Sequence, residues 1–262
     1  MNWSDRGLVI GARGHGEAAV VLDLLTREHG RHLGLVHGGR SRRLRPVLQP
    51  GNEVAANWRA RLEEQLGTFV VEAETLWAAR LMTSSLALCG LATLTAHLRH
   101  LPERDPHPAL FDRAVALVAV LDDPLVAPSA LVRFELDLLA ELGFGLDLET
   151  CAVTGGRDDL AYVSPRTGRA VGREAGAPYR ERLLALPALL TSAGPAGPDD
   201  LAAAFRLTGH FLASQLYEPR GGAVPDERAR FVGLAGGRRA AGAPSDMLSP
   251  ATPADSRRDG TR

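Results

Sequence analysis

Apolar residues occur in short runs over the first 75 positions of the chain, and turns that contain glycine separate these runs. One run alternates apolar and polar residues, as a strand with one buried face does, and the others have the length of buried strands. Five such strands predict a small closed or partly open β-barrel. The expected strands are 8–12, 18–26, 32–38, 51–62 and 67–75. A short helix is the alternative for 53–66, because Ala, Arg and Glu also favour helices.

From residue 76 the apolar spacing becomes that of helices. The stretch 76–101 is almost continuously apolar, which predicts a buried helix. Apolar residues then repeat at helical spacing over 110–121. A third helix is expected to begin at Pro128, which suits a first turn, and to end at Gly143, where a glycine cap is favourable.

The helical pattern lapses into an irregular, turn-rich insert at 146–172 and returns over 177–190 and 198–216. Beyond 233 the chain is rich in Gly, Ala, Pro, Ser and Arg and has little to bury, so a disordered tail is expected. The fold class is therefore α+β, a barrel followed by a helical domain. The predicted domain ranges are 1–78, 79–232 and the tail at 233–262.

Composition narrows the possible chemistry. All 30 basic residues are arginine, which is typical of a GC-rich genome and excludes Schiff bases, lysine nucleophiles and a P-loop lysine. The N-terminus lacks the pattern of a signal peptide, and the longest apolar run, about 86–96, is too short to span a bilayer. The two cysteines do not make a secreted disulfide scaffold, so a cytoplasmic protein is expected.

Charge is distributed unevenly along the chain. Residues 1–61 carry ten arginines and five acidic residues, a formal charge of +5, whereas the whole chain has −1. A basic segment of this kind indicates an anionic partner. The alternative is an ordinary solvated surface.

The basic residues concentrate in the stretch HGGRSRRLRPVLQPG at 37–51, which contains no acid. Guanidinium groups suit phosphate oxygens, and barrels of this kind bind oligonucleotides on one face and its bordering loops. Since exposed aromatic residues for base stacking are scarce, we expect contacts to the phosphate backbone with little sequence preference. The candidate nucleic-acid-binding residues are Arg40, Arg42, Arg43 and Arg45, with Arg13 from the first turn and Arg59 and Arg61 from the next strand.

Other candidate sites are weaker. The glycine string GARGHG precedes a predicted strand rather than a helix, so it reads as a hairpin and not as a phosphate-binding loop. Histidines do not cluster with acids at metal-ligand spacing, and no nucleophile elbow is present. Cys151 lacks the second cysteine of a C-x-x-C pair, because position 154 is Thr154, so we predict no metal site in the insert. Since no group of catalytic residues is recognisable either, we predict that the protein is not an enzyme.

The order GLVIGARGHGEAAVVLDLLTREHGRHLGLVHGGRSRR, followed by LQPGNEV, resembles the opening of the RecO family of bacterial recombination mediators. A second segment, RFELDLLAELGFGLDLETCAVTG at 133–155, resembles the central helix of that family and its cysteine-bearing insert. The resemblance is collinear over 8–216. It implies an N-terminal OB-fold barrel and a helical domain with a degenerate zinc-finger-like insert.

The resemblance also implies a non-enzymatic role in DNA repair and homologous recombination. Members of the family bind single- and double-stranded DNA, anneal complementary strands and work with a RecR-type mediator. They help to load the recombinase onto DNA covered by single-strand binding protein, whose acidic, apolar C-terminal tail they bind with the helical domain. By this resemblance, the family's basic loop contains Arg40, Arg42 and Arg43. Arg133 is the candidate residue for binding the C-terminal tail of single-strand binding protein. Some members hold zinc with four cysteines; here only Cys151 remains, so no cofactor is expected. The resemblance adds association with the nucleoid.

Two other functions fit parts of the sequence. The same arginines would serve an RNA-binding or translation-associated barrel protein. An enzyme would have to use the insert around Cys151, Asp158 and Asp159.

Overall fold

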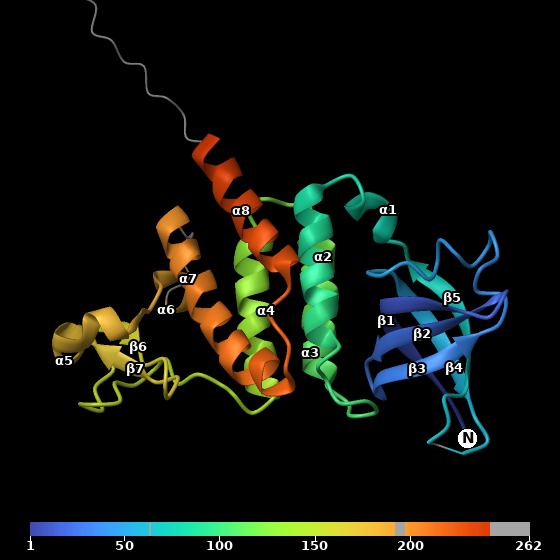
Figure 1. Cartoon of the computed structure of the whole chain (residues 1–262), viewed down its shortest axis with the longest axis horizontal. Coiled ribbons are helices and arrows are strands. Elements are labelled where there is room, and N and C mark those ends of the chain that lie inside the picture. The colour runs from blue at the N-terminus through green and yellow to red at the C-terminus, as the bar shows by residue number, and fades with distance from the viewer. Residues whose placement is uncertain (63, 192–196, 242–262) are drawn as a thin grey trace, which may run out of the picture.

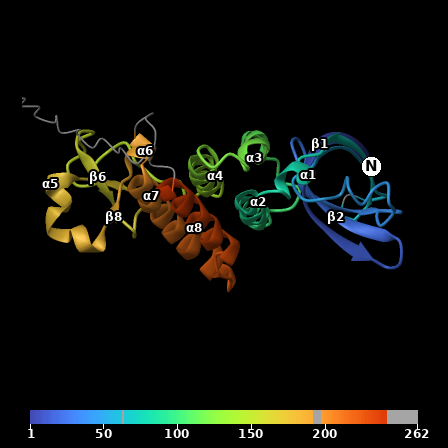
Figure 2. The same ribbon diagram turned by 90° about the horizontal axis from the view of Figure 1, so that it is seen from above.

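The computed structural model describes residues 1–62, 64–191 and 197–241. A β-barrel lies at one end of the molecule, helices fill the middle, and a small sheet lies at the other end (Figures 1 and 2). This arrangement confirms the α+β fold class. Among the described residues, no helix combines the length and the apolar character needed to cross a membrane.

The barrel contains five strands, in the closed order β1-β2-β3-β5-β4. Its core is built from alternate residues of the strands, with Trp58 and Leu22 fully enclosed. All five predicted strands are present, and the alternative helix at 53–66 is wrong because this segment pairs with both β1 and β5. The strands are β1 (Asn2–His15), β2 (Ala19–Thr26), β3 (Gly30–Val36), β4 (Glu53–Arg59) and β5 (Thr68–Thr75).

The predicted helix at 76–101 is two helices, α1 (Ala78–Leu81) and α2 (Ser85–Leu98). The Ser84 hydroxyl accepts a hydrogen bond from the Ala87 amide and so begins a new helix at this point. The other two predicted helices are confirmed as α3 (Pro108–Val120) and α4 (Ala127–Glu141).

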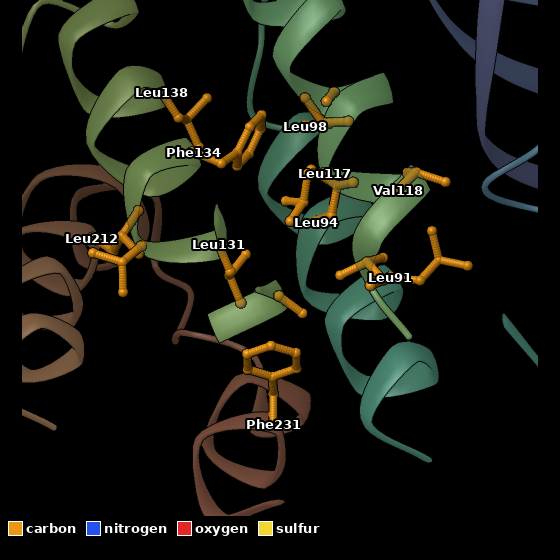
Figure 3. Close-up of a cluster of buried hydrophobic side chains, with 14 of the residues drawn as sticks. Leu91, Leu94, Leu98, Leu117, Val118, Leu131, Phe134, Leu138, Leu212 and Phe231 are labelled. Atoms are coloured by element: carbon orange, nitrogen blue, oxygen red, sulfur yellow. The ribbon is translucent and has the colours of Figure 1, made fainter. Parts of the chain in front are cut away.

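One continuous core joins these helices to the C-terminal elements. The helices α2, α3 and α4 present leucine and phenylalanine side chains to each other, and Leu212 and Phe231 reach the same cluster from later in the chain (Figure 3). These two residues belong to the π-helical turn η2 (Leu212–Tyr217) and to α8 (Asp226–Ala241). α7 (Pro198–Phe211) precedes η2, and the 3-10 turn η3 (Glu218–Arg220) follows it.

The region after α4 is more ordered than predicted. The insert contributes two strands to a three-stranded sheet of order β7-β6-β8, so it is only partly irregular. The helix predicted at 177–190 is interrupted: residues 177–182 form a 3-10 helix and Ala188–Thr191 a short α-helix, but Leu184–Ala185 pairs with β6 and Pro187 lies two residues after this strand. The elements are β6 (Leu160–Val163), β7 (Ala170–Gly172), α5 (Arg173–Gly176), the 3-10 helix η1 (Ala177–Arg182), β8 (Leu184–Ala185) and α6 (Ala188–Thr191).

The disorder predicted beyond 233 is also wrong for the first part of the tail. α8 continues to Ala241, past Gly233, and packs against α2 and α7. The remainder of the predicted tail, 242–262, lies outside the described residues.

The barrel is fixed against the helices. Leu8, Ile10 and Leu25 belong to the barrel strands but are buried in the same cluster as the helical residues. The β2–β3 turn is also held from the helical side, because the Arg104 amide donates to the Arg31 carbonyl at 2.8 Å. Gly30 has a φ of +69°, and a Cβ there would lie 2.1 Å from the Asp105 carbonyl oxygen, so only glycine fits this contact.

Candidate nucleic-acid interface

The connection between β3 and β4, residues 37–52, is called the basic loop below. It is folded on itself: the Arg45 amide donates to the Ser41 carbonyl at 3.0 Å, and the Leu48 amide donates to the Leu44 carbonyl at 3.0 Å. The Leu48 side chain is buried in the barrel core, and Asn52 Nδ2 donates to the Pro46 carbonyl at 2.8 Å. The loop is therefore an anchored turn rather than an open linker.

The basic loop also packs against the β1–β2 hairpin. The Arg40 amide donates to the Ala18 carbonyl at 3.2 Å. A Cβ at Gly39 would lie 2.8 Å from Val20 Cβ, so glycine allows the loop to approach the start of β2 closely. These contacts place the arginines beside the tip of the hairpin.

A groove of about 580 Å³ separates the hairpin from the basic loop; we call it the barrel groove. Glycines leave the hairpin side open, since no heavy atom lies within 4 Å of a Cβ built at Gly14 or Gly16. A wall with so few side chains lets a ligand approach the backbone closely. The groove is lined by Ala12, Gly14, Gly16 and Val20 on the hairpin side and by Gly39, Arg40, Arg45, Leu48 and Gln49 on the loop side.

The four loop arginines are exposed, and two of them, Arg40 and Arg45, line the barrel groove. Arg40 Nη1 donates to the Gly16 carbonyl at 3.1 Å and so reaches across to the hairpin. Among the described residues, none of the four forms an ion pair with a carboxylate. Arg42 and Arg43 lie on the same exposed loop. Their charges are thus available to an anionic ligand.

The other predicted arginines are not brought into this groove. Ala12 and Gly14 face the groove, so the alternation along β1 directs Arg13 to the opposite face of the strand. Arg59 pairs with Asn2 at the start of β1, and Figure 1 shows the β4–β5 hairpin beside the N-terminus, away from the β1–β2 hairpin tip. Arg61 follows in the same hairpin and is exposed.

Comparison with known proteins gives the same family for the barrel and for most of the helical region. A family model described as Recombination protein O N terminal matches residues 1–76, and one described as Recombination protein O C terminal matches residues 85–222. The chain belongs to the RecO family. The two matches correspond to the barrel and to the helical region with its insert.

Curated relatives support the same assignment. The chain is 58% identical over 246 residues to the DNA repair protein RecO of Methylorubrum populi, with 91% of this chain and all of that protein covered. Identity to the protein of the same name from Methylobacterium nodulans is 60%, covering 89% of this chain and 98% of that protein. The Brucella abortus protein is 50% identical, with 90% and 96% covered. A role in DNA repair and recombination follows from membership of this family.

Arg133, the candidate tail-binding residue, borders a small cleft of about 180 Å³ between α3 and α4. A second guanidinium, that of Arg113, lies on the other side and pairs with Asp137 at 2.9 Å. Burial raises the pKa of the Asp137 carboxyl, although the charges of Arg113 and Arg133 oppose this change. Leu117 and Phe134 give the cleft an apolar floor. Two guanidinium groups and one carboxylate, that of Asp137, lie over an apolar surface and suit an acidic, apolar peptide.

The insert does not offer the ligands of the zinc site that some RecO proteins carry. Cys151 is buried, and its sulfur accepts a hydrogen bond from the Gly172 amide at 3.2 Å. The Thr154 hydroxyl and neighbouring amides lower the pKa of the Cys151 thiol to about 6. Within the described ranges, no three His, Cys, Asp or Glu side chains are grouped so that they could hold a metal. The residues present do not fit tetrahedral zinc, and the absence of a cofactor stays a prediction.

The sequence did not predict that the glycines of the β1–β2 hairpin form one wall of the barrel groove. The string GARGHG was correctly interpreted as a hairpin, with Gly16 at a φ of +57° in its turn. Its proximity to the basic loop depends on contacts between residues 24 positions apart, such as that of Arg40 with Gly16. The only signal in the sequence was the spacing of Gly14 and Gly16 near the tip.

Proposed function

We propose that this protein binds single- and double-stranded DNA along the barrel groove, anneals complementary strands and helps to load the recombinase onto DNA covered by single-strand binding protein. The observation that carries the proposal is the row of exposed loop arginines, unpaired within the described part of the chain, beside an open groove of a barrel. Each phosphate that a guanidinium neutralises releases counterions and adds affinity that does not depend on sequence.

Annealing brings two polyanions together, and the basic loop reduces their repulsion. The contacts go to phosphates and not to base edges, so they hold a strand without selecting its sequence. Watson–Crick pairing then supplies the specificity. No bond is formed or broken by the protein in this scheme, which needs neither a catalytic group nor a cofactor.

The helical region is proposed to bind the C-terminal tail of single-strand binding protein in the α3–α4 cleft. Arg113 and Arg133 would meet the carboxylates of the tail, and Leu117 and Phe134 its apolar side chains. Binding there keeps the protein close to covered DNA while the barrel groove takes the strand. A RecR-type mediator and, indirectly, the recombinase filament complete the set of partners, in the cytoplasm at the nucleoid.

DNA binding is tested with the triple variant R40A/R42A/R43A. Its affinity for both forms of DNA should fall, and the slope of log K against log salt should decrease by about 0.9 per lost duplex contact and about 0.7 per lost single-strand contact. Fluorescence anisotropy at several salt concentrations measures both quantities.

A matched control removes the same charge from the helical region. R180A/R182A/R206A replaces three exposed arginines that lie outside the barrel, and it should leave the slope nearly unchanged. If the two triple variants lost DNA affinity equally, the loss would be explained by the change in net charge and not by the basic loop. A marked preference of the wild-type protein for structured RNA over DNA would favour the RNA-binding alternative.

A further inference from the structure

A second groove, of about 460 Å³, lies on the helical side of the basic loop; we call it the apolar groove. Its loop wall is Gln49 and Pro50, and its helical wall comes from α1, from α2 and from the residues that directly follow them, with Glu227 contributed by α8. Two large apolar side chains in it are exposed to solvent, Met82 by 61% and Leu88 by 44%. Leu91 and Ala92 continue the apolar surface between them and the barrel.

The apolar groove and the barrel groove meet at one residue. Gln49 lines both of them, and its side-chain amide donates to the Arg45 carbonyl at 2.9 Å, so it is held against the basic loop. The adjoining Gly51 amide donates to the Val9 carbonyl at 2.8 Å, and a Cβ there would lie 3.1 Å from the Leu91 side chain. The segment 49–51 therefore separates the barrel groove, with its arginines, from the apolar groove.

The tryptophan rings of the barrel are not free to stack on a base. Trp58 is fully buried, and Trp3 stacks on His29 with the ring centroids 4.2 Å apart. Their rings are taken up by the packing of the barrel and do not form a platform beside the basic loop. Exposed apolar side chains are supplied instead by Met82 and Leu88 in the groove that shares Gln49 with the barrel groove, and a methionine sulfur makes favourable contacts with flat rings.

We infer that the apolar groove receives the unstacked bases of a single strand whose phosphates lie in the barrel groove. The inference rests on the proposed function and adds which part of the strand each groove contacts. Duplex bases are stacked and paired, so they cannot leave the helix to reach this surface without the cost of unstacking. The apolar groove thus gives the protein a preference for single strands that the arginines alone do not provide.

The double variant M82S/L88S tests this assignment. Both side chains are exposed, so their replacement leaves the core intact. We expect its Kd for single-stranded DNA to rise roughly fivefold, because apolar contacts with the bases are lost, while its Kd for duplex DNA stays unchanged. The matched control L125S/V153S replaces two exposed apolar residues elsewhere in the chain and should change neither constant.

A base analogue supplies a direct readout. The emission of 2-aminopurine in a single strand should change when the strand binds the wild-type protein, and this change should be reduced for M82S/L88S and for the milder variant Leu88→Gln. Circular dichroism confirms that each variant is folded.

The outcomes separate the two proposals. If M82S/L88S binds both forms of DNA as the wild-type protein does, while R40A/R42A/R43A weakens both, the apolar groove is not a base site and the proposed function stands. If the arginine variant changes neither constant, the proposed function fails. Equal losses of M82S/L88S on single strands and duplex also overturn the inference. A binding defect of M82S/L88S that is seen only on DNA covered by single-strand binding protein would also overturn the inference, because it would indicate that the apolar groove binds a polypeptide.

Discussion

A single buried carboxylate, Glu135 in α4, organises the C-terminal elements. Arg228 Nε donates to Glu135 Oε1 at 2.7 Å, and the Thr208 hydroxyl donates to Oε2. Burial is the largest single effect and raises the pKa of Glu135, but the Arg228 charge, together with hydrogen bonds from Arg228 and His97, outweighs burial and lowers the pKa to about 2. The largely buried Glu135–Arg228 pair therefore holds α8 to α4, and the hydrogen bond from Thr208 holds α7.

Replacement of Arg228 alone should destabilise the protein much more than replacement of both Glu135 and Arg228. Arg228→Met leaves the Glu135 carboxylate buried without its cation, so the free energy of unfolding should fall by about 3–5 kcal/mol. The double variant Glu135→Leu/Arg228→Met should recover most of this loss, since no buried charge remains. Urea denaturation at pH 7 measures both, and a double variant less stable than Arg228→Met would contradict the expectation.

His32 in the barrel makes stability depend on pH. Burial, and then the charge of Arg104, lower the pKa of this imidazole from 6.5 to about 4. The unfolded chain takes up the proton below about 6.5 and the folded chain only below about 4, so stability falls as the pH falls through this window, by at most about 3 kcal/mol. His32→Leu should flatten this part of the stability curve. Thermal unfolding between pH 4 and 7 tests it, and parallel curves for variant and wild type would refute it.

At the scale of elements, the predictions succeeded where local pattern decides structure. The strands of the barrel follow from short apolar runs separated by glycine-containing turns, and α4 ends at Glu141, just before Gly143, whose φ of +85° is that expected of a glycine cap. The predictions failed where contacts with residues distant in sequence decide the local structure. Leu184–Ala185 is a strand because β6 is beside it, and α8 is held by Arg228 and Phe231 despite the glycines at its end. The loop arginines were likewise visible in the sequence, whereas the groove they border was not.

The β2–β3 turn joins the barrel to the helices, and Gly30 is its critical residue. Gly30→Ala puts a Cβ against the Asp105 backbone at a positive φ, so the free energy of unfolding should fall by more than about 2 kcal/mol. Gly16→Ala is the control: its φ of +57° is similar, but nothing lies within 4 Å of the new Cβ, and the loss should be about 1 kcal/mol. Equal losses in urea denaturation would show that backbone strain alone matters.

On the scale of the whole molecule, the two proposed sites lie in different parts of the chain. Residues 1–61 carry +5, but residues 62–78 add four acids and no arginine, so the barrel region 1–78 carries +1 and the remainder −2. The barrel lies at one end of the molecule, with the helices beside it (Figure 1). The α3–α4 cleft combines Arg113 and Arg133 with an apolar floor, so it is suited to an acidic, apolar peptide rather than to a strand. The shared core of barrel and helices keeps the two sites at a fixed distance.

Because the sites are separate, a variant of one should leave the other working. Arg133→Ala should anneal bare complementary strands at the wild-type rate and lose most of its annealing on strands covered by single-strand binding protein. When that protein lacks its C-terminal tail, wild type and variant should be equally slow, since neither can use the cleft. R40A/R42A/R43A should be slow in all three conditions, because it lacks the contacts to phosphate. Fluorescence quenching between labelled strands gives the rates, and an Arg133→Ala defect on bare DNA would place this arginine in the DNA site instead.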